Sequence, residues 1–297
     1  MSVSDTSRSP SPIAPLAEAL EEASALDPLG KRVGKTVRNL IEPGAAKDAL
    51  SGTWLGHALH PLLTDVVIGS FTSANVLDLI GGDDDGRAAE RLIGVGIAAY
   101  VPTALTGVTD WADSELGDPG VRRVGLVHAG SNALALGLYG ASLAARRRGD
   151  RTRGKLLGFS GAAVLAAAGY LGGHLSYAQG IGVDQTVFDE GPEDWTEAGA
   201  ASDLAEGKPT RVVVDDTPVL LLRHGDGLHA LHDRCSHRGC SLSEGELDGE
   251  SIVCACHGSR FRLDDGSIER GPATTPQPAF EVREREGRVE VRLGSDG

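Results

Sequence analysis

The feature that most restricts the fold of this chain is a group of cysteines and histidines near its C-terminal end. All four cysteines lie between Cys235 and Cys256, in the stretches CSHRGC (235–240) and CACHGS (254–259). Read as metal ligands, these stretches give Cys-x-His, sixteen intervening residues and Cys-x-x-His. Clustered cysteines with nearby histidines predict a metal site in preference to a disulfide scaffold. Two loops must therefore meet around one metal centre.

The donor types narrow the kind of centre. Thiolates suit iron in a sulfide cluster, and imidazoles add neutral ligands to one of its irons. Two loops that each give one Cys and one His can hold the two ends of a two-iron, two-sulfur cluster. A zinc site on the same residues is the alternative that the motif alone leaves open.

The surrounding sequence predicts a small all-β domain. From Lys208, short runs such as RVVVDD, PVLLLRH and FEVRERE alternate with turns that contain Gly and Asp. Short β-rich runs between turn residues are typical of such a domain. The motif and its flanks resemble the Rieske family of iron-sulfur proteins over about residues 208–293. The resemblance includes a proline-rich covering loop at Gly271–Pro278.

The resemblance implies roles for individual residues. By it, Cys235 and Cys254 bind one iron, and His237 and His257 bind the other, exposed iron. Ser259 matches a hydroxyl that hydrogen-bonds a cluster sulfur in the respiratory members of the family.

Two positions depart from those respiratory members. Phe261 stands where they carry Tyr, so we expect one hydrogen bond fewer and a reduction potential below the upper end of the family. Arg238 replaces an apolar residue in the first loop. This second departure weakens the expectation that the domain docks at a quinol site as its relatives do.

The other two cysteines also fit the resemblance. Cys240 and Cys256 match positions that form a disulfide between the cluster loops in Rieske proteins of quinol-oxidising respiratory complexes. Rieske ferredoxins and oxygenase domains usually lack this pair. A disulfide here favours an oxidising, extracytoplasmic compartment. The alternative is two free, buried thiols in a cytoplasmic domain.

Four stretches nearer the N-terminus are mostly apolar and free of internal Lys or Arg. Each is long enough, as a helix, to cross the ~30 Å hydrocarbon layer of a membrane. Their many small residues allow close helix packing in lipid, and they lack the charged face of a soluble helix. We therefore predict a four-helix transmembrane bundle, with a soluble Ala-rich bundle as the alternative. The stretches are Pro61–Ile80, Leu92–Thr109, Val124–Ala145 and Leu156–Ala178.

Loop charges predict the orientation of this bundle. One side carries eight bases, six of them in RRRGDRTRGK (146–155), whereas the other carries Arg122, Arg123 and Lys47. The positive-inside rule puts the eight-base side in the cytoplasm and both chain ends outside. The N-terminal residues lack the basic start and following apolar run of a cleavable signal peptide, so none is predicted. Four bases in the preceding tail would then also have to cross, namely Lys31, Arg32, Lys35 and Arg38.

Alternating topology also gathers ionisable residues at one membrane face. Ionisable residues are costly inside a membrane, so their presence there suggests a function. We therefore take His60, His128 and His174 as candidate ligands of a haem b or partners of a quinone, with ordinary helix capping as the alternative. The stretch from Leu55 to Phe188, opening on GHxxHP, resembles a bacterial four-helix membrane domain of unassigned function, sometimes joined to Rieske domains. The ionisable residues expected at this one membrane face are His57, His60, His128, His174, Asp65 and Asp110.

These patterns predict an α + β multidomain chain. Residues 1–54 form a tail with an amphipathic helical segment, and residues 55–180 form the membrane domain. Residues 181–207, rich in acids and without a base, form a linker before the Rieske domain at 208–297.

The predicted function is one-electron transfer by a membrane-anchored protein in a respiratory or quinol-linked chain. A quinol or a redox protein would be its partner. The alternatives are an oxidoreductase that uses the membrane histidines, a ferredoxin-type donor to an oxygenase, and a zinc-stabilised interaction module. The chain shows no separate domain with two His and a carboxylate for mononuclear iron, so it is not predicted to be an oxygenase itself. Its net charge of −14 argues against a nucleic-acid partner.

Overall fold

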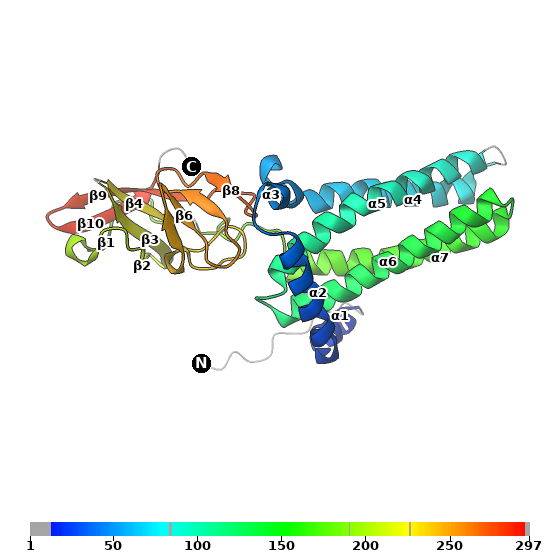
Figure 1. Cartoon of the computed structure of the whole chain (residues 1–297), viewed down its shortest axis with the longest axis horizontal. Coiled ribbons are helices and arrows are strands. Elements are labelled where there is room, and N and C mark those ends of the chain that lie inside the picture. Colours follow the sequence, from blue (N-terminus) through cyan, green and yellow to red (C-terminus); the bar gives the residue numbers. More distant parts are fainter. Residues whose placement is uncertain (1–12, 83–84, 190, 226, 295–297) are drawn as a thin grey trace. The chain divides into compact units, whose positions relative to one another are not determined.

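The chain folds as two compact units in a computed structural model that describes residues 13–82, 85–189, 191–225 and 227–294 (Figure 1). One unit combines Met1–Asn39 with Leu63–Ile181. The other combines Leu40–Leu62 with Gly182–Gly297. Residues 1–12 of the predicted N-terminal tail lie outside the described residues.

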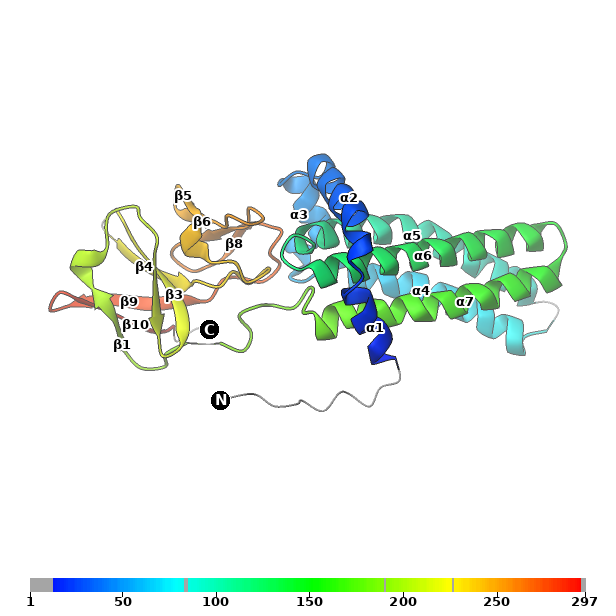
Figure 2. The same cartoon turned by 90° about the horizontal axis from the view of Figure 1, so that it is seen from below.

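The first unit is helical. Its long helices α4 to α7 run alongside one another, and α1 lies against α6 (Figures 1 and 2). Each of the four predicted apolar stretches falls within one of these long helices, the last extended by the π-helical turn His174–Ala178. The α-helices are α1 (Ala14–Glu21), α2 (Asp27–Leu40), α4 (Leu59–Ile80), α5 (Gly86–Ser114), α6 (Pro119–Arg147) and α7 (Arg151–Gly173). A further short helix, α3 (Ala45–Ser51), belongs to the second unit.

The predicted count of four membrane helices needs correction. The described residues contain seven α-helices, and three helical segments are long and apolar enough to cross a membrane. These are Leu59–Ile80, Gly86–Ser114 and Arg151–Ala178. Helix α6 is as long as α5 but carries His128 and Asn132 in its middle turns, which makes it the more polar of the two.

The long helices bury an ion pair beside an apolar core and expose many large apolar side chains. The guanidinium of Arg146 pairs with the carboxylate of Asp78, and their side chains are 2% and 1% exposed. The ammonium of Lys155 donates to the Asp78 carbonyl at 2.9 Å. Meanwhile large apolar side chains such as Val101 and Leu156 are more than half exposed. Large apolar side chains on the outer surface distinguish these helices from a soluble bundle, whose outer surface is mainly polar.

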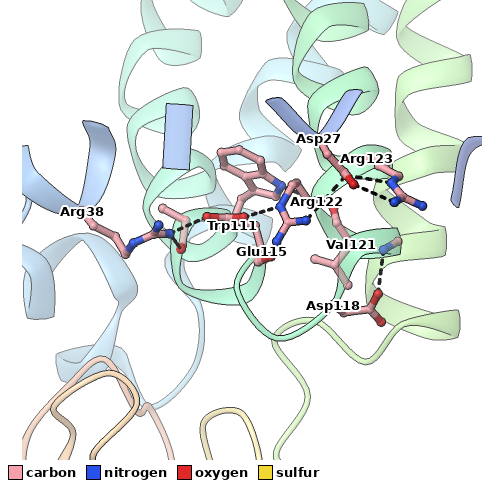
Figure 3. A network of polar contacts seen from close by, with 10 residues as sticks. Asp27, Arg38, Trp111, Glu115, Asp118, Val121, Arg122 and Arg123 are labelled. Atoms are coloured by element: carbon pink, nitrogen blue, oxygen red, sulfur yellow. Dashed lines mark hydrogen bonds and ion pairs between the residues drawn. The ribbon is translucent and has the colours of Figure 1, made fainter. Parts of the chain in front are cut away.

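Three arginines fasten α2 to the turn between α5 and α6 (Figure 3). The buried carboxylate of Glu115 accepts from Arg38 Nη1 at 2.7 Å and from Arg122 Nε at 2.5 Å. Arg123 forms a two-bond pair with Asp27, both bonds at 2.8 Å. The amphipathic segment predicted in the tail is therefore a helix held by paired charges.

The second unit contains two antiparallel sheets. The larger has the strand order β1-β10-β9-β4-β3-β2, and the smaller has the order β5-β6-β7-β8. The larger sheet comprises β1 (Thr196–Ala200), β2 (Thr210–Val214), β3 (Thr217–His224), β4 (Gly227–His232), β9 (Ala279–Arg285) and β10 (Arg288–Leu293). The smaller comprises β5 (Glu246–Asp248), β6 (Ser251–Val253), β7 (Arg260–Arg262) and β8 (Ile268–Arg270).

Strand β1 lies inside the segment predicted as an acidic linker and pairs with β10. The linker prediction 181–207 is therefore too long, because acidic residues such as Glu197 occupy an edge strand of the sheet.

Strand β3 separates two apolar cores. Val219 and Leu221 face the core that the larger sheet encloses, together with Phe280. Leu220 and Leu222 face the opposite way, into a core shared with the smaller sheet. Alternation of side chains along a strand produces this division. Cys235 and Cys254 belong to the second core, which positions the metal-binding motif at the smaller sheet.

Candidate cluster site

The two motif loops have the same local structure. The first follows β4, the second follows β6, and each begins with a cysteine. In both loops the fourth residue after that cysteine is a glycine that donates its N–H to the cysteine carbonyl. Gly239 bonds Cys235 at 2.8 Å, and Gly258 bonds Cys254 at 3.0 Å. These glycines have φ of +75° and +78°, a conformation that other residues adopt only at a cost.

The tight turns aim backbone N–H groups at the two thiol sulfurs. Cys235 accepts from the N–H groups of His237 and Arg238, and Cys254 accepts from those of Cys256 and His257. Hydrogen bonds of this kind favour the thiolate form, which is the metal-binding form.

The two thiols themselves adjoin each other and are buried. Their mutual hydrogen bond, followed by burial, raises the pKa of Cys235 well above its ordinary value. The same hydrogen bond is the largest cause that lowers the pKa of Cys254 to about 7. The two adjoining sulfurs are therefore placed to bind one metal centre together.

The two histidines of the motif also adjoin each other. The rings of His237 and His257 meet edge to face, with centroids 5.0 Å apart. The buried Nδ1 of His237 has no hydrogen-bond partner among the described residues. Two adjacent thiols, two adjacent imidazoles and an orphaned ring nitrogen fit a two-iron cluster with mixed ligands.

A disulfide joins the two loops beside this site. Cys240 and Cys256 are bonded, with their Cα atoms 6.5 Å apart, as the resemblance implied. Their sulfurs lie within 4.8 Å of the Cys254 sulfur. Cys235 and Cys254 are the free cysteines among the described residues, so the thiols available for iron are these two.

Ser259 lies at the end of the second cluster loop and Phe261 lies in β7, and the hydrogen bond from Ser259 to a cluster sulfur stays a prediction. Ser259 is fully buried, and its side-chain oxygen accepts a bond from Ala273 N–H in the proline-rich loop. Phe261, also fully buried, belongs to the apolar core next to the two free cysteines.

Gln277, a residue that the motif did not indicate, fastens the proline-rich loop to the first cluster loop. Its Nε2 donates to the carbonyls of His232 and Arg234, and its Oε1 accepts from Ser236 N–H at 2.9 Å. The side chain is 1% exposed. Its place between two prolines, which cannot donate backbone hydrogen bonds, is the one sequence sign of such a role.

A second missed residue supports the first cluster loop. The buried carboxylate of Asp233 accepts from Ser241 Oγ at 2.6 Å and from both the N–H and the hydroxyl of Ser243. These bonds fix the stretch between Cys240 and β5 to Asp233, which precedes the first cluster loop.

The bundle histidines take part in separate contacts. Nδ1 of His128 is 2.9 Å from the Ala168 carbonyl, and Asn132 lies beside the same ring. Nε2 of His174 is 2.6 Å from the Glu21 carboxylate. His60 belongs to the other compact unit, so their predicted gathering at one membrane face stays a prediction.

Comparison with known proteins agrees with both units. Residues 194–281 match the Rieske [2Fe-2S] domain, and residues 56–185 match a family described as "predicted membrane protein (DUF2231)". Ferredoxin CarAc of Metapseudomonas resinovorans is 42% identical over 98 residues, which are 33% of this chain and 92% of that protein. The chain belongs to the Rieske family. Its Rieske domain is fused to the helical domain, as the sequence predicted.

Other relatives come from different electron-transfer systems. The anthranilate 1,2-dioxygenase ferredoxin subunit of Burkholderia cepacia is 33% identical over 34% of this chain and 94% of that protein. The cytochrome b6-f complex iron-sulfur subunit of Chlorobaculum tepidum is 32% identical over 32% of this chain and 51% of that protein. The Rieske domain is therefore an electron-transfer domain with an iron-sulfur cluster, and it shares sequence with ferredoxins and with a subunit of a cytochrome b6-f complex.

Proposed function

We propose that this protein is a membrane-anchored one-electron carrier whose Rieske cluster is held by Cys235 and Cys254 on one iron and by His237 and His257 on the other. The observation that carries this proposal is the convergence of the two thiols and the two imidazoles on matching loops. When bound, such a cluster accepts and releases one electron. The chain's own residues fix the loops, supply thiolate-stabilising N–H groups and exclude water from the sulfur side.

The exposed apolar side chains of the long helices support membrane anchoring. A buried Arg146–Asp78 pair surrounded by exposed apolar side chains is costly in water and suits lipid. The match to a family of membrane proteins and three sufficiently apolar helices support the same reading. We propose that α6 crosses with them, because its polar His128 and Asn132 bond to neighbouring protein groups.

We further propose that the Rieske domain lies on the extracytoplasmic side. The loop 146–155 supplies six of the eight bases that the positive-inside rule assigns to the cytoplasm. The Cys240–Cys256 disulfide independently favours an oxidising compartment. A quinol or an extracytoplasmic redox protein is then the partner that exchanges the electron.

For the bundle histidines we propose structural hydrogen bonding instead of haem or quinone binding. The Nε2 of His174 is occupied by Glu21, and the His128 ring is held by Ala168 and Asn132. The proposal therefore needs the iron-sulfur cluster alone.

The second candidate function is a ferredoxin-type donor to an oxygenase. The relatives named as dioxygenase ferredoxins favour it. A cytoplasmic Rieske domain would be required, which the disulfide opposes.

Spectroscopy of detergent-purified protein tests the central proposal. We expect two irons per chain, visible absorption that bleaches on reduction, and an EPR signal of the reduced protein at low temperature. A colourless protein that contains zinc would overturn the proposal, since zinc gives neither signal. Accessibility of the Rieske domain to protease in intact cells tests the side of the membrane. Reduction by a quinol, compared with reduction by a ferredoxin reductase, separates the two candidate functions.

A further inference from the structure

Part of the cluster site comes from a segment far away in the sequence. Residues Leu40–Leu62, here called the cover segment, belong to the same compact unit as the Rieske domain. More than a hundred residues separate the two in the chain. The cover segment contains the short helix α3, and its contacts in this unit include the second cluster loop and the start of the proline-rich loop.

Glycines in those loops make the contact possible. A side chain at Gly258, the residue after His257, would lie 3.6 Å from Pro43. A side chain at Gly271 would collide with the hydroxyl of Thr53 and lie 3.1 Å from the Asp48 carboxylate. The cover segment thus packs directly against backbone next to a ligand histidine and at the start of the proline-rich loop.

Polar groups bind the segment at this contact. The Asp48 carboxylate accepts a hydrogen bond from Gly271 N–H and lies within range of the Arg270 charge. Burial is the larger influence and raises the pKa of Asp48. Arg270 Nη2 also lies beside Gly44, 3.2 Å from the position that a Cβ atom on this glycine would occupy.

The cover segment brings a buried cation to the site. Lys47 is 4% exposed, an unusual position for a lysine in a short helix. Its neighbour Asp48 accepts the hydrogen bond from Gly271 N–H, and Pro43, just before the same helix, lies beside Gly258, the residue after His257. Lys47 is therefore held at the edge of the cluster loops.

We propose that Lys47 is a positioning residue for electron transfer, which stabilises the reduced state of the cluster and so raises its reduction potential. Reduction by the proposed redox partner would transfer one electron, and so one negative charge, to the cluster. A cation held near the histidine-bound iron, away from water, favours the more negative state. The cover segment also shields this edge, so that the potential is set by a fixed charge and not by mobile ions. This inference rests on the proposed ligation of the cluster.

A redox titration followed by EPR tests the inference with matched variants of the full chain. Lys47→Gln removes the charge, and we expect a lower midpoint potential with unchanged iron content. Lys47→Arg keeps the charge and should restore most of the potential. Lys208→Gln, which removes an exposed lysine of the same unit, should leave the potential unchanged. A Lys47→Gln protein with a full cluster and the potential of the unmodified protein would overturn the inference.

A measurement on the unmodified protein covers the case in which Lys47→Gln fails to hold its cluster. Amine-reactive labelling followed by mass spectrometry should modify Lys208 at least tenfold faster than Lys47. Equal labelling rates would show that Lys47 is not covered and would overturn the inference. Failure of the proposed function is distinguishable, because the unmodified protein would then lack the EPR signal before any variant is measured.

Discussion

The side-chain oxygen of Ser259 accepts a hydrogen bond from the backbone N–H of Ala273, with a distance of 3.0 Å between oxygen and nitrogen. Both residues are fully buried, and they join the second cluster loop to the proline-rich loop. Because this bond uses a lone pair of the oxygen, the hydroxyl proton remains available to a cluster sulfur.

Replacement of Ser259 should therefore lower the reduction potential. We expect Ser259→Ala to keep its cluster and to lose tens of millivolts, since about 1.4 kcal/mol corresponds to about 59 mV for one electron. Ser236→Ala is the matched control, because that hydroxyl donates to the Thr275 carbonyl instead. Redox titration followed by circular dichroism measures both. Equal potentials for Ser259→Ala and the unmodified protein would contradict a hydrogen bond to the cluster.

The Cys240–Cys256 disulfide should hold the cluster in place. Loss of a disulfide that closes a loop of this size, with a sequence separation of 16, costs about 3 kcal/mol. A double Cys240→Ser and Cys256→Ser variant should lose its visible absorption to an iron chelator several-fold faster than the unmodified protein. The reductant dithiothreitol should speed the loss in the unmodified protein and leave the double variant unaffected. Identical rates of loss would argue that the loops need no covalent tether.

Gln277 should stabilise the Rieske domain through its three hydrogen bonds. Gln277→Ala leaves two buried carbonyls and one buried N–H without a partner, which costs about 2–4 kcal/mol in free energy of unfolding. Gln185→Ala, which removes a bond to the exposed Arg234 side chain, should cost less than about 1 kcal/mol. Urea unfolding monitored by cluster absorbance measures the difference. Comparable losses for the two variants would assign Gln277 a minor role.

Glu115 should be the main anchor of α2 on the helical unit. Its carboxylate is fully buried and bonds both Arg122 and Arg38 (Figure 3). Glu115→Gln leaves the buried Arg122 with only its longer 3.6 Å pair to Asp27 and should cost about 3 kcal/mol. Arg147→Gln breaks an exposed pair with Glu90 and should cost at most about 1 kcal/mol. Thermal unfolding in detergent, followed by helical circular dichroism, compares them, and similar melting temperatures would contradict the anchor.

The attachment of α2 to the helical unit should also weaken at low pH. The hydrogen bond from Arg123 is the largest cause that lowers the pKa of Asp27 to about 2, from an ordinary value of 3.8. A carboxylate with a lowered folded-state pKa stabilises the fold above the unfolded value, and this contribution is lost as pH falls through the folded value. Protease protection of residues 13–39 should therefore be constant above about pH 5 and decline between about pH 4 and 2. In the Asp27→Asn variant, this segment should be less protected from protease at pH 6, and its protection should no longer fall through titration of Asp27. A fall in protection with acid that is the same in the variant and the unmodified protein would contradict the role of Asp27.

Local patterns in the sequence were enough for much of the molecule. The Cys and His spacing predicted the two-loop motif, since each loop closes on itself through bonds between near neighbours such as Cys235 and Gly239. Continuous apolar runs predicted the four long helices, because helix formation depends on neighbouring residues. The loop residues Cys240 and Cys256 were paired by family resemblance, and the structure bears this out.

Other features depended on contacts between distant residues. The edge strand β1 was read as linker, because its acidic composition resembles a loop until it pairs with β10. Sequence patterns report local conformation and leave such pairing unspecified.

By itself, the sequence determined that the chain carries a Rieske motif and long apolar helices, since both are written in short-range spacing. Only the tertiary structure decided what surrounds the motif. Gln277 fastens two loops, and Lys47 is buried on the short helix α3. The prolines beside Gln277 are its one local sign and Lys47 has none, because a buried polar side chain is defined by the partners that folding brings to it.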